Sequence, residues 1–206
     1  MNDSSALPSR VSFQGVKSLW GDLTSWILTL LPTHLNVKNI EPDKNINNWT
    51  HINNDIKFLE KSKYGRVIRL ERTNDTSSSY AASQNVKVAT GQEYSMSVLA
   101  KPSQHKGFLG LRLSGVYQDR LDAVFDLSSS EVKNTFSGGD FHLTQASALE
   151  LDDGWIKCEI RGRVSSEKVR MIFGPTNSRI RPGIWESKAG GIKEIKIIHS
   201  LFHSKF

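Results

Sequence analysis

Strict alternation of apolar and polar residues is the feature that most limits what this chain can fold into. Between residues 155 and 161, Ile156, Cys158 and Ile160 alternate with aromatic or charged residues. Successive side chains of a strand point to opposite faces, so this period of two predicts a strand with one buried face and one solvated face. The same alternation recurs in the segments 64–73, 94–100, 108–114 and 168–173.

The repeated alternation predicts an all-β fold. About ten short strands at regular spacing, separated by Gly, Ser and Asn turns, favour a two-sheet antiparallel jelly-roll sandwich over residues 35–200. Residues 1–34 are expected to form a polar tail and an amphipathic helix, because apolar residues recur three and four positions apart from Val16 to Leu31, just before Pro32. The helix is expected to pack on the β domain or on a partner protein. Residues 201–206 are expected to be a C-terminal tail.

Charge and cysteine content narrow the possible partners. The 206-residue chain carries a formal charge of +6, which either favours an anionic partner or only aids solubility. Nucleic acid is not the expected partner, because the sequence lacks a basic helix, an RNA-binding aromatic strand and a zinc motif. No stretch approaches the roughly 18 apolar residues of a membrane span. The polar first residues predict no secretory signal, and the lone Cys158 slightly favours a cytoplasmic or otherwise reducing compartment.

Three segments together resemble a known family. The run 88–102, VATGQEYSMSVLAKP, resembles a strand of the carbohydrate-binding-module family 4/9 type of jelly roll. The segments 123–127 (AVFDL) and 148–158 (ALELDDGWIKC) resemble a signature of related sandwich domains in phage tail and surface glycan proteins. Ile156 and Lys157 depart from that signature, which has an aromatic residue and an Arg there. The resemblance implies a galactose-binding-like jelly roll that commonly binds sugar, although some members are purely architectural.

The resemblance also implies a possible metal site. Members of this group often hold a structural Ca²⁺ between the first strand and an acidic pair on the last strand. Glu41 and Glu194 are the candidate ligands here, and Lys193 replaces one expected acid. Ca²⁺ takes six to eight oxygen ligands, so these two carboxylates would supply only part of a site.

Two alternative sugar sites follow from the residue types. Sugars are bound by exposed aromatic rings beside planar polar side chains. If the outward residues of several strands share one sheet, they form a cationic face suited to an acidic glycan. That face would contain Arg69, Arg112, Lys157, Arg161 and Arg170, with Phe108 and Trp155 among them. The alternative is that these cations are solvated side chains on two different sheets, whose long stems cover apolar surface.

The second candidate site lies in the loops, where binding residues of sandwiches usually gather. Its residues are Tyr117, Gln118, Asp119, Arg120 and Asp122 between two strands, and Trp185 in the turn-rich segment 182–191.

Catalysis is not expected. Asp152 and Asp153 are adjacent turn residues, so they cannot flank a glycosidic bond. The six His residues show no metal-binding spacing, and no nucleophile or phosphate-loop motif occurs. The expected function is a non-catalytic module that binds a poly- or oligosaccharide, acidic or neutral, beside a glycan-active enzyme. The alternative is a structural or adaptor domain of a phage tail or multidomain assembly, without a ligand of its own.

Overall fold

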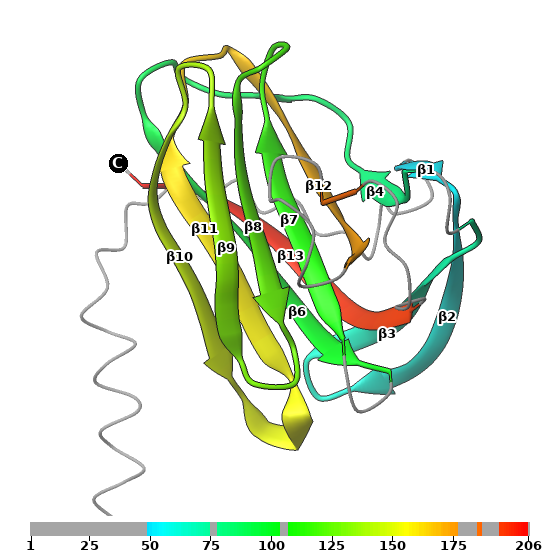
Figure 1. Cartoon of the computed structure of the whole chain (residues 1–206). Coiled ribbons are helices and arrows are strands. Elements are labelled where there is room, and N and C mark those ends of the chain that lie inside the picture. The colour runs from blue at the N-terminus through cyan, green and yellow to red at the C-terminus, as the bar shows by residue number, and fades with distance from the viewer. Residues whose placement is uncertain (1–48, 75–77, 104–106, 177–184, 187–193, 206) are drawn as a thin grey trace, which may run out of the picture. The chain divides into compact units, whose positions relative to one another are not determined.

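Over the residues that the structure describes, the protein is all-β, as predicted. A computed structural model describes residues 49–74, 78–103, 107–176, 185–186 and 194–205 (Figure 1). The strands are β1 (Thr50–Ile52), β2 (Asn54–Ser62), β3 (Gly65–Arg72), β4 (Tyr80–Ala82), β5 (Val86–Lys87), β6 (Glu93–Pro102), β7 (Phe108–Ser114), β8 (Arg120–Asp126), β9 (Glu131–Gly138), β10 (His142–Glu150), β11 (Ile156–Arg163), β12 (Lys168–Thr176) and β13 (Glu194–Lys205). A 3₁₀ turn spans Asp152–Gly154.

The strands form two antiparallel sheets. Sheet A has the order β1-β4-β12-β7-β8-β9, with β5 also paired to β12. Sheet B has the order β10-β11-β6-β13-β3-β2. Strands far apart in the sequence lie side by side, since β13 runs between β6 and β3, and β12 runs between β4 and β7 (Figure 1). Each sheet therefore needs both halves of the chain.

The core lies between the two sheets and is built from the alternating positions. Leu109, Leu111 and Leu113 of β7 are fully buried and share one cluster with Met96 and Val98 of β6. Burying each such side chain contributes about 1.5–3 kcal/mol. The predicted inward positions of β11 and β12 are confirmed as well. Those residues are Ile156, Cys158, Ile160, Val169, Met171 and Phe173.

Strands β9 and β10 were not predicted from the sequence. Most side chains of both strands are exposed or half-buried, so neither shows the apolar alternation that marks a strand with one buried face. Both lie at sheet edges, β9 in sheet A and β10 in sheet B. A strand at an edge can be held by backbone pairing to one neighbour, and this pairing leaves little trace in the side chains.

The predicted C-terminal tail is wrong for residues 201–205. Strand β13 continues to Lys205 and pairs with β6 as far as Lys205↔Glu93. The segment 80–88 contains two short strands, β4 and β5. The predicted N-terminal helix and its boundary near residue 34 lie outside the described residues. Within the described ranges, no helix is long and apolar enough to cross a membrane.

Candidate functional site

Three loops meet at one end of the sandwich, and Asp119 joins them. The loops are 115–119 between β7 and β8, 139–141 between β9 and β10, and 164–167 between β11 and β12. Asp119 Oδ1 accepts a hydrogen bond from the Asp140 amide at 3.0 Å, and its Oδ2 accepts bonds from the hydroxyls of Ser165 and Ser166, also at 3.0 Å. The Asp140 N–H is the largest cause of the lowered pKa of Asp119; the two hydroxyls add to it, and burial opposes it. Asp119 therefore holds the loops together.

The loop 115–119 is a tight turn with one unusual residue. The Asp119 amide donates to the Val116 carbonyl at 2.8 Å, and the Gly115 amide donates to the Asp119 carbonyl at 2.8 Å. Gln118, the third residue of the four-residue turn, has a φ of 80°. A positive φ is needed at this place in a type II turn, but it costs a non-glycine residue about 1–2 kcal/mol. Backbone strain of this kind concentrates at functional sites.

The turn forms one wall of a pocket, which we call the loop-end pocket. It has a volume of about 320 Å³ and is lined by Tyr117, Gln118, Arg120, Phe136, Gly138 and Gly139. Tyr117 is 91% exposed and Phe136 is 39% exposed. The guanidinium of Arg120 lies 5.3 Å from the centre of the Phe136 ring. Two aromatic rings, one guanidinium and one amide therefore converge on a cavity that is open to solvent.

Two glycines allow the loops to approach each other at this pocket. A Cβ at Gly138 would lie 2.7 Å from the Gln118 carbonyl oxygen and 2.9 Å from the Phe136 ring. Gly139 has a φ of 63°, and a Cβ there would collide with the Asp119 carboxylate. Any side chain at either position would push against the turn that carries Tyr117 and Gln118.

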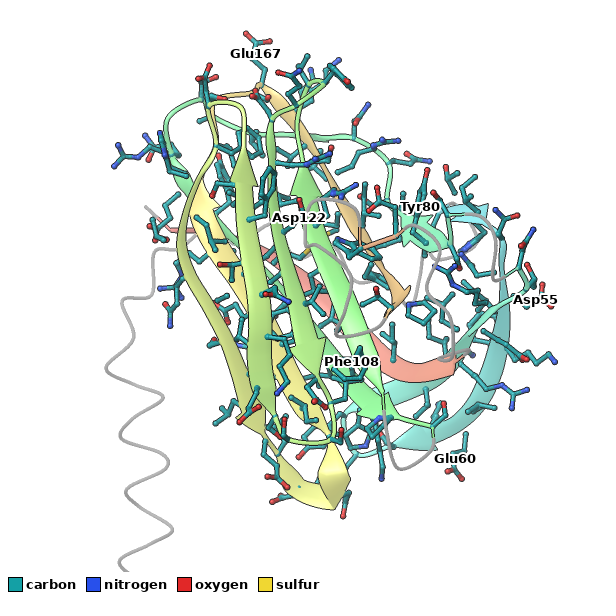
Figure 2. All side chains as sticks on the ribbon, in the orientation of Figure 1. Asp55, Glu60, Tyr80, Phe108, Asp122 and Glu167 are labelled. Atoms are coloured by element: carbon teal, nitrogen blue, oxygen red, sulfur yellow. The ribbon has the colours of Figure 1, made fainter. Side chains whose placement is uncertain are left out.

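A buried charged cluster lies beside the pocket on the outer face of sheet A. Asp122 projects from β8 (Figure 2), and its Oδ1 accepts hydrogen bonds from Arg112 Nε at 2.7 Å and from Trp185 Nε1 at 2.8 Å. The Arg112 terminal nitrogens donate to the two carboxylate oxygens of Glu186, each at 2.8 Å. We refer to Arg112, Asp122, Trp185 and Glu186 as the outer-face cluster.

The outer-face cluster anchors residues 185–186 on the sheet. Trp185 is fully buried, and its ring occupies the space that a side chain at Gly110 would need. The Trp185 carbonyl accepts a hydrogen bond from Thr176 Oγ1 at 2.7 Å, and the Glu186 carbonyl accepts one from the Ser79 amide at 2.8 Å. Trp185 in this position is a packing residue and cannot present its ring to a sugar.

Burial controls the electrostatics of the cluster. Desolvation raises the pKa of Asp122 to about 6, against the opposing effects of Arg112 and Arg120. Burial by itself would lower the pKa of Arg112, but the negative charges of Asp122 and Glu186 outweigh it and raise this pKa. Asp122 Oδ2 has no hydrogen-bond partner among the described residues and lies 3.4 Å from Arg120 Nε. Arg120 thus connects the cluster to the loop-end pocket.

The structure brings most of the predicted loop residues together. Tyr117 and Arg120 line the pocket, Asp119 holds the loops that form it, and Asp122 lies 3.4 Å from Arg120 Nε. Arg112 joins Asp122 in the cluster, where it is 7% exposed. Gln118 of the predicted loop lines the pocket as well, whereas Phe136, Gly138 and Gly139 were missed as site residues. Phe136 could not be recognised from the sequence, because it lies in a polar segment that was not predicted to be a strand.

Of the two interpretations of the cations, a single cationic face is wrong, because they lie on two different sheets. Arg112 and Arg170 lie on sheet A, but Arg69, Lys157 and Arg161 lie on sheet B. The cations of sheet B are paired with acids on their own face. Lys157 and Arg161 contact Glu159 at 2.8 Å and 3.0 Å, and Arg69 lies 3.9 Å from Glu71. Trp155 is buried against Val67, and Phe108 packs on the cluster that contains Trp185.

The proposed calcium site stays a prediction. Glu41 lies outside the described residues, and Glu194 begins β13 opposite Glu71. Over the part of the chain that the structure describes, no group of three or more His, Cys, Asp or Glu residues could hold a metal ion. The turn acids expected to be non-catalytic are paired with a cation, since Lys63 Nζ lies 2.9 Å from Asp152 and 3.4 Å from Asp153.

Comparison with known proteins identifies no family for this chain. Neither a scan against protein-family models nor a search of curated proteins finds a match.

Proposed function

We propose that this chain is a non-catalytic carbohydrate-binding module of the jelly-roll type, which binds a poly- or oligosaccharide in the loop-end pocket. The observation that carries the proposal is the convergence of Tyr117, Phe136, Arg120 and Gln118 on one open cavity. Aromatic rings stack on the C–H faces of a sugar, while a guanidinium and an amide hydrogen-bond its hydroxyl groups. The strained φ of Gln118 supports the same assignment.

The topology supports the jelly-roll part of the proposal. Both sheets mix early and late strands, and the two segments that resemble the sugar-binding family lie side by side, because β6 pairs with β11 from Ala100↔Ile156 to Glu93↔Arg163. The turn Asp152–Gly154 enters β11 beside Trp155, which is 5% exposed. The turn and Trp155 therefore act on the register of sheet B. We assign sugar binding instead to the loops of sheet A. An accessory role beside a glycan-active enzyme is consistent with such a surface.

The first experiment is a glycan array with the full chain and with Tyr117→Ala. Tyr117 is almost fully exposed, so its loss should leave the melting temperature unchanged. The loss of one stacking ring should weaken binding by about tenfold. Leu149→Ala removes another exposed apolar side chain, 58% exposed on β10, and should not affect binding. If Tyr117→Ala binds every retained glycan as tightly as the parent protein, the pocket is not the binding site.

A structural or adaptor role is the second candidate, and strand β2 favours it. This strand is at the edge of sheet B and exposes Phe58 at 46% and Leu59 at 38%. An edge strand with exposed apolar side chains can pair with another chain. Absence of glycan binding together with concentration-dependent self-association in sedimentation velocity would support this candidate over the first.

A further inference from the structure

The charged groups around the loop-end pocket point to a more specific ligand. We infer that the pocket binds a saccharide that carries a carboxylate, and that Arg120 is the residue that recognises this carboxylate. The inference depends on the proposed function, since it names the kind of sugar taken by the same pocket.

Arg120 sets the charge of the pocket lining. Among the described residues that line the pocket, it is the one whose side chain is charged at neutral pH. The two nearest carboxylates in sequence are engaged elsewhere. Asp119 accepts three hydrogen bonds that hold the loops, and Asp122 is fully buried in the outer-face cluster. The ligand therefore meets a cation, two rings and an amide.

Arg120 is also positioned so that part of its guanidinium stays available. Its Nε lies 3.4 Å from Asp122 Oδ2, and its guanidinium carbon lies over the ring of Phe136, 5.3 Å from the ring centre. The side chain is 31% exposed, and it makes no hydrogen bond to another residue that the structure describes. A guanidinium held on one side by an acid and a ring can offer its terminal N–H groups to a carboxylate as a fork. Because the side chain is already ordered, binding costs less conformational entropy.

A second cation lies on the same row of sheet A. Arg170 of β12 is opposite Ser114 of β7, and Ser114 is opposite Arg120 of β8. Neighbouring strands are about 4.8 Å apart, so the two arginine backbones are separated by roughly 10 Å. The Arg170 side chain is exposed. An oligosaccharide with more than one acidic unit could place one carboxylate on Arg120 and another toward Arg170.

A neutral sugar is the competing ligand, because Arg also donates to hydroxyl groups. The two ligands differ in the strength of their hydrogen bonds to Arg120, since hydrogen bonds between ionised partners are about twice as strong as neutral ones. The carboxylate itself is therefore what the experiment has to vary.

The test uses pairs of saccharides that differ only in this group. Oligogalacturonate, oligomannuronate, hyaluronan oligosaccharides and sialyllactose are each titrated into the full chain by calorimetry, beside their carboxyl-reduced counterparts. We expect at least one acidic ligand to bind about tenfold or more tightly than its reduced form, and the difference to shrink in high salt. Arg120→Gln should remove that difference, because the acidic form loses the ionic hydrogen bonds and the reduced form loses only the weaker hydrogen bonds to its hydroxyl groups.

Two variants serve as controls. Arg66→Gln removes an exposed arginine that lies over Phe58 at 5.1 Å on sheet B, which matches the Arg120–Phe136 pair, and it should not affect binding. Arg120→Lys keeps the charge without the fork, so it should lose part of the preference even if Arg120→Gln does not fold. Equal binding of acidic and reduced forms, unchanged by either Arg120 variant, would overturn the inference and leave the proposed function standing. Failure of every saccharide to bind would overturn both.

Discussion

Asp122 is the residue at which burial and charge oppose each other most strongly. It is fully buried, yet its carboxylate accepts hydrogen bonds from Arg112 and Trp185 and forms an ion pair with Arg120. A buried carboxylate is tolerated when its partners replace water, and removal of one partner leaves an uncompensated charge. In this protein the partners satisfy one oxygen with two hydrogen bonds and leave the other with an ion pair alone. Burial outweighs these partners, so the ionised form is disfavoured and the pKa of Asp122 is raised.

The raised pKa of Asp122 predicts a particular pH dependence of stability. The folded state holds this proton up to about pH 6, whereas the unfolded chain releases it near pH 3.8, the ordinary value. The folded state binds more protons between these values, so the contribution of Asp122 to the free energy of unfolding falls as pH rises through this window, by up to about 3 kcal/mol. Urea unfolding of the parent and of Asp122→Asn at pH 4, 5, 6 and 7 measures this contribution as the difference between their free energies of unfolding.

The direction in which that difference changes with pH is the critical outcome. The advantage of the parent over Asp122→Asn should decline from pH 4 to pH 6 and stay constant above pH 6. A difference that grows with pH would mean that Arg112 and Arg120 outweigh burial and lower the pKa of Asp122. Carboxyl chemical shifts in NMR, followed over the same range, identify the titrating group directly.

At the scale of elements, β13 has the largest consequence for the architecture. It lies between β6 and β3 and so connects the two halves of sheet B. Its last residues pair with the start of β6, from Leu201↔Ser97 to Lys205↔Glu93. The inward side chains of that part of β6 include Tyr94 and Met96, at 5% and 0% exposure. The end of β13 therefore supports a strand that carries core residues.

Deletion of residues 201–206 should consequently destabilise the protein. Each lost backbone hydrogen bond costs about 1 kcal/mol net, so the loss should reach several kcal/mol and lower the thermal midpoint by many degrees. Circular dichroism melting curves measure the effect. Removal of Phe206 alone leaves β13 intact to Lys205 and is the control. If the longer deletion melts at the same temperature as the parent, these residues are a tail, as the sequence suggested.

At the scale of the whole molecule, one continuous core holds the two sheets together. Cys158 lies in this core with no exposed surface, and burial strongly raises the pKa of its thiol. A thiol of this kind reacts with labelling reagents only when the surrounding structure opens. The residue is a small core side chain, as its inward position on β11 predicted.

The reactivity of Cys158 should therefore report global unfolding. We expect thiol labelling in native buffer to be far slower than in denaturant, with a rate that rises with urea in parallel with the unfolding rate. Ser129→Cys in a Cys158→Ala background places a thiol at an exposed turn and should react at once. Rapid labelling of Cys158 in native buffer would show that the core around β11 opens locally without global unfolding.

The sequence by itself determined the all-β class, the two-layer arrangement and the inward faces of β6, β7, β11 and β12. Period-two alternation is a local property, and burial of one face leaves it in the residues themselves. It also placed Tyr117 in a turn between two strands, because turn residues are recognisable locally.

Only the tertiary structure decided which strands share a sheet and which polar residues meet. Sheet membership depends on pairing between distant strands, so the sequence could not separate Arg69 on sheet B from Arg112 on sheet A. The same pairing brings Phe136 of β9 beside Arg120 of β8, and buries Trp185 on Gly110 of β7. The exposure of a residue at such a site depends on which distant segments of the chain pack over it, and alternation within one strand does not predict that packing.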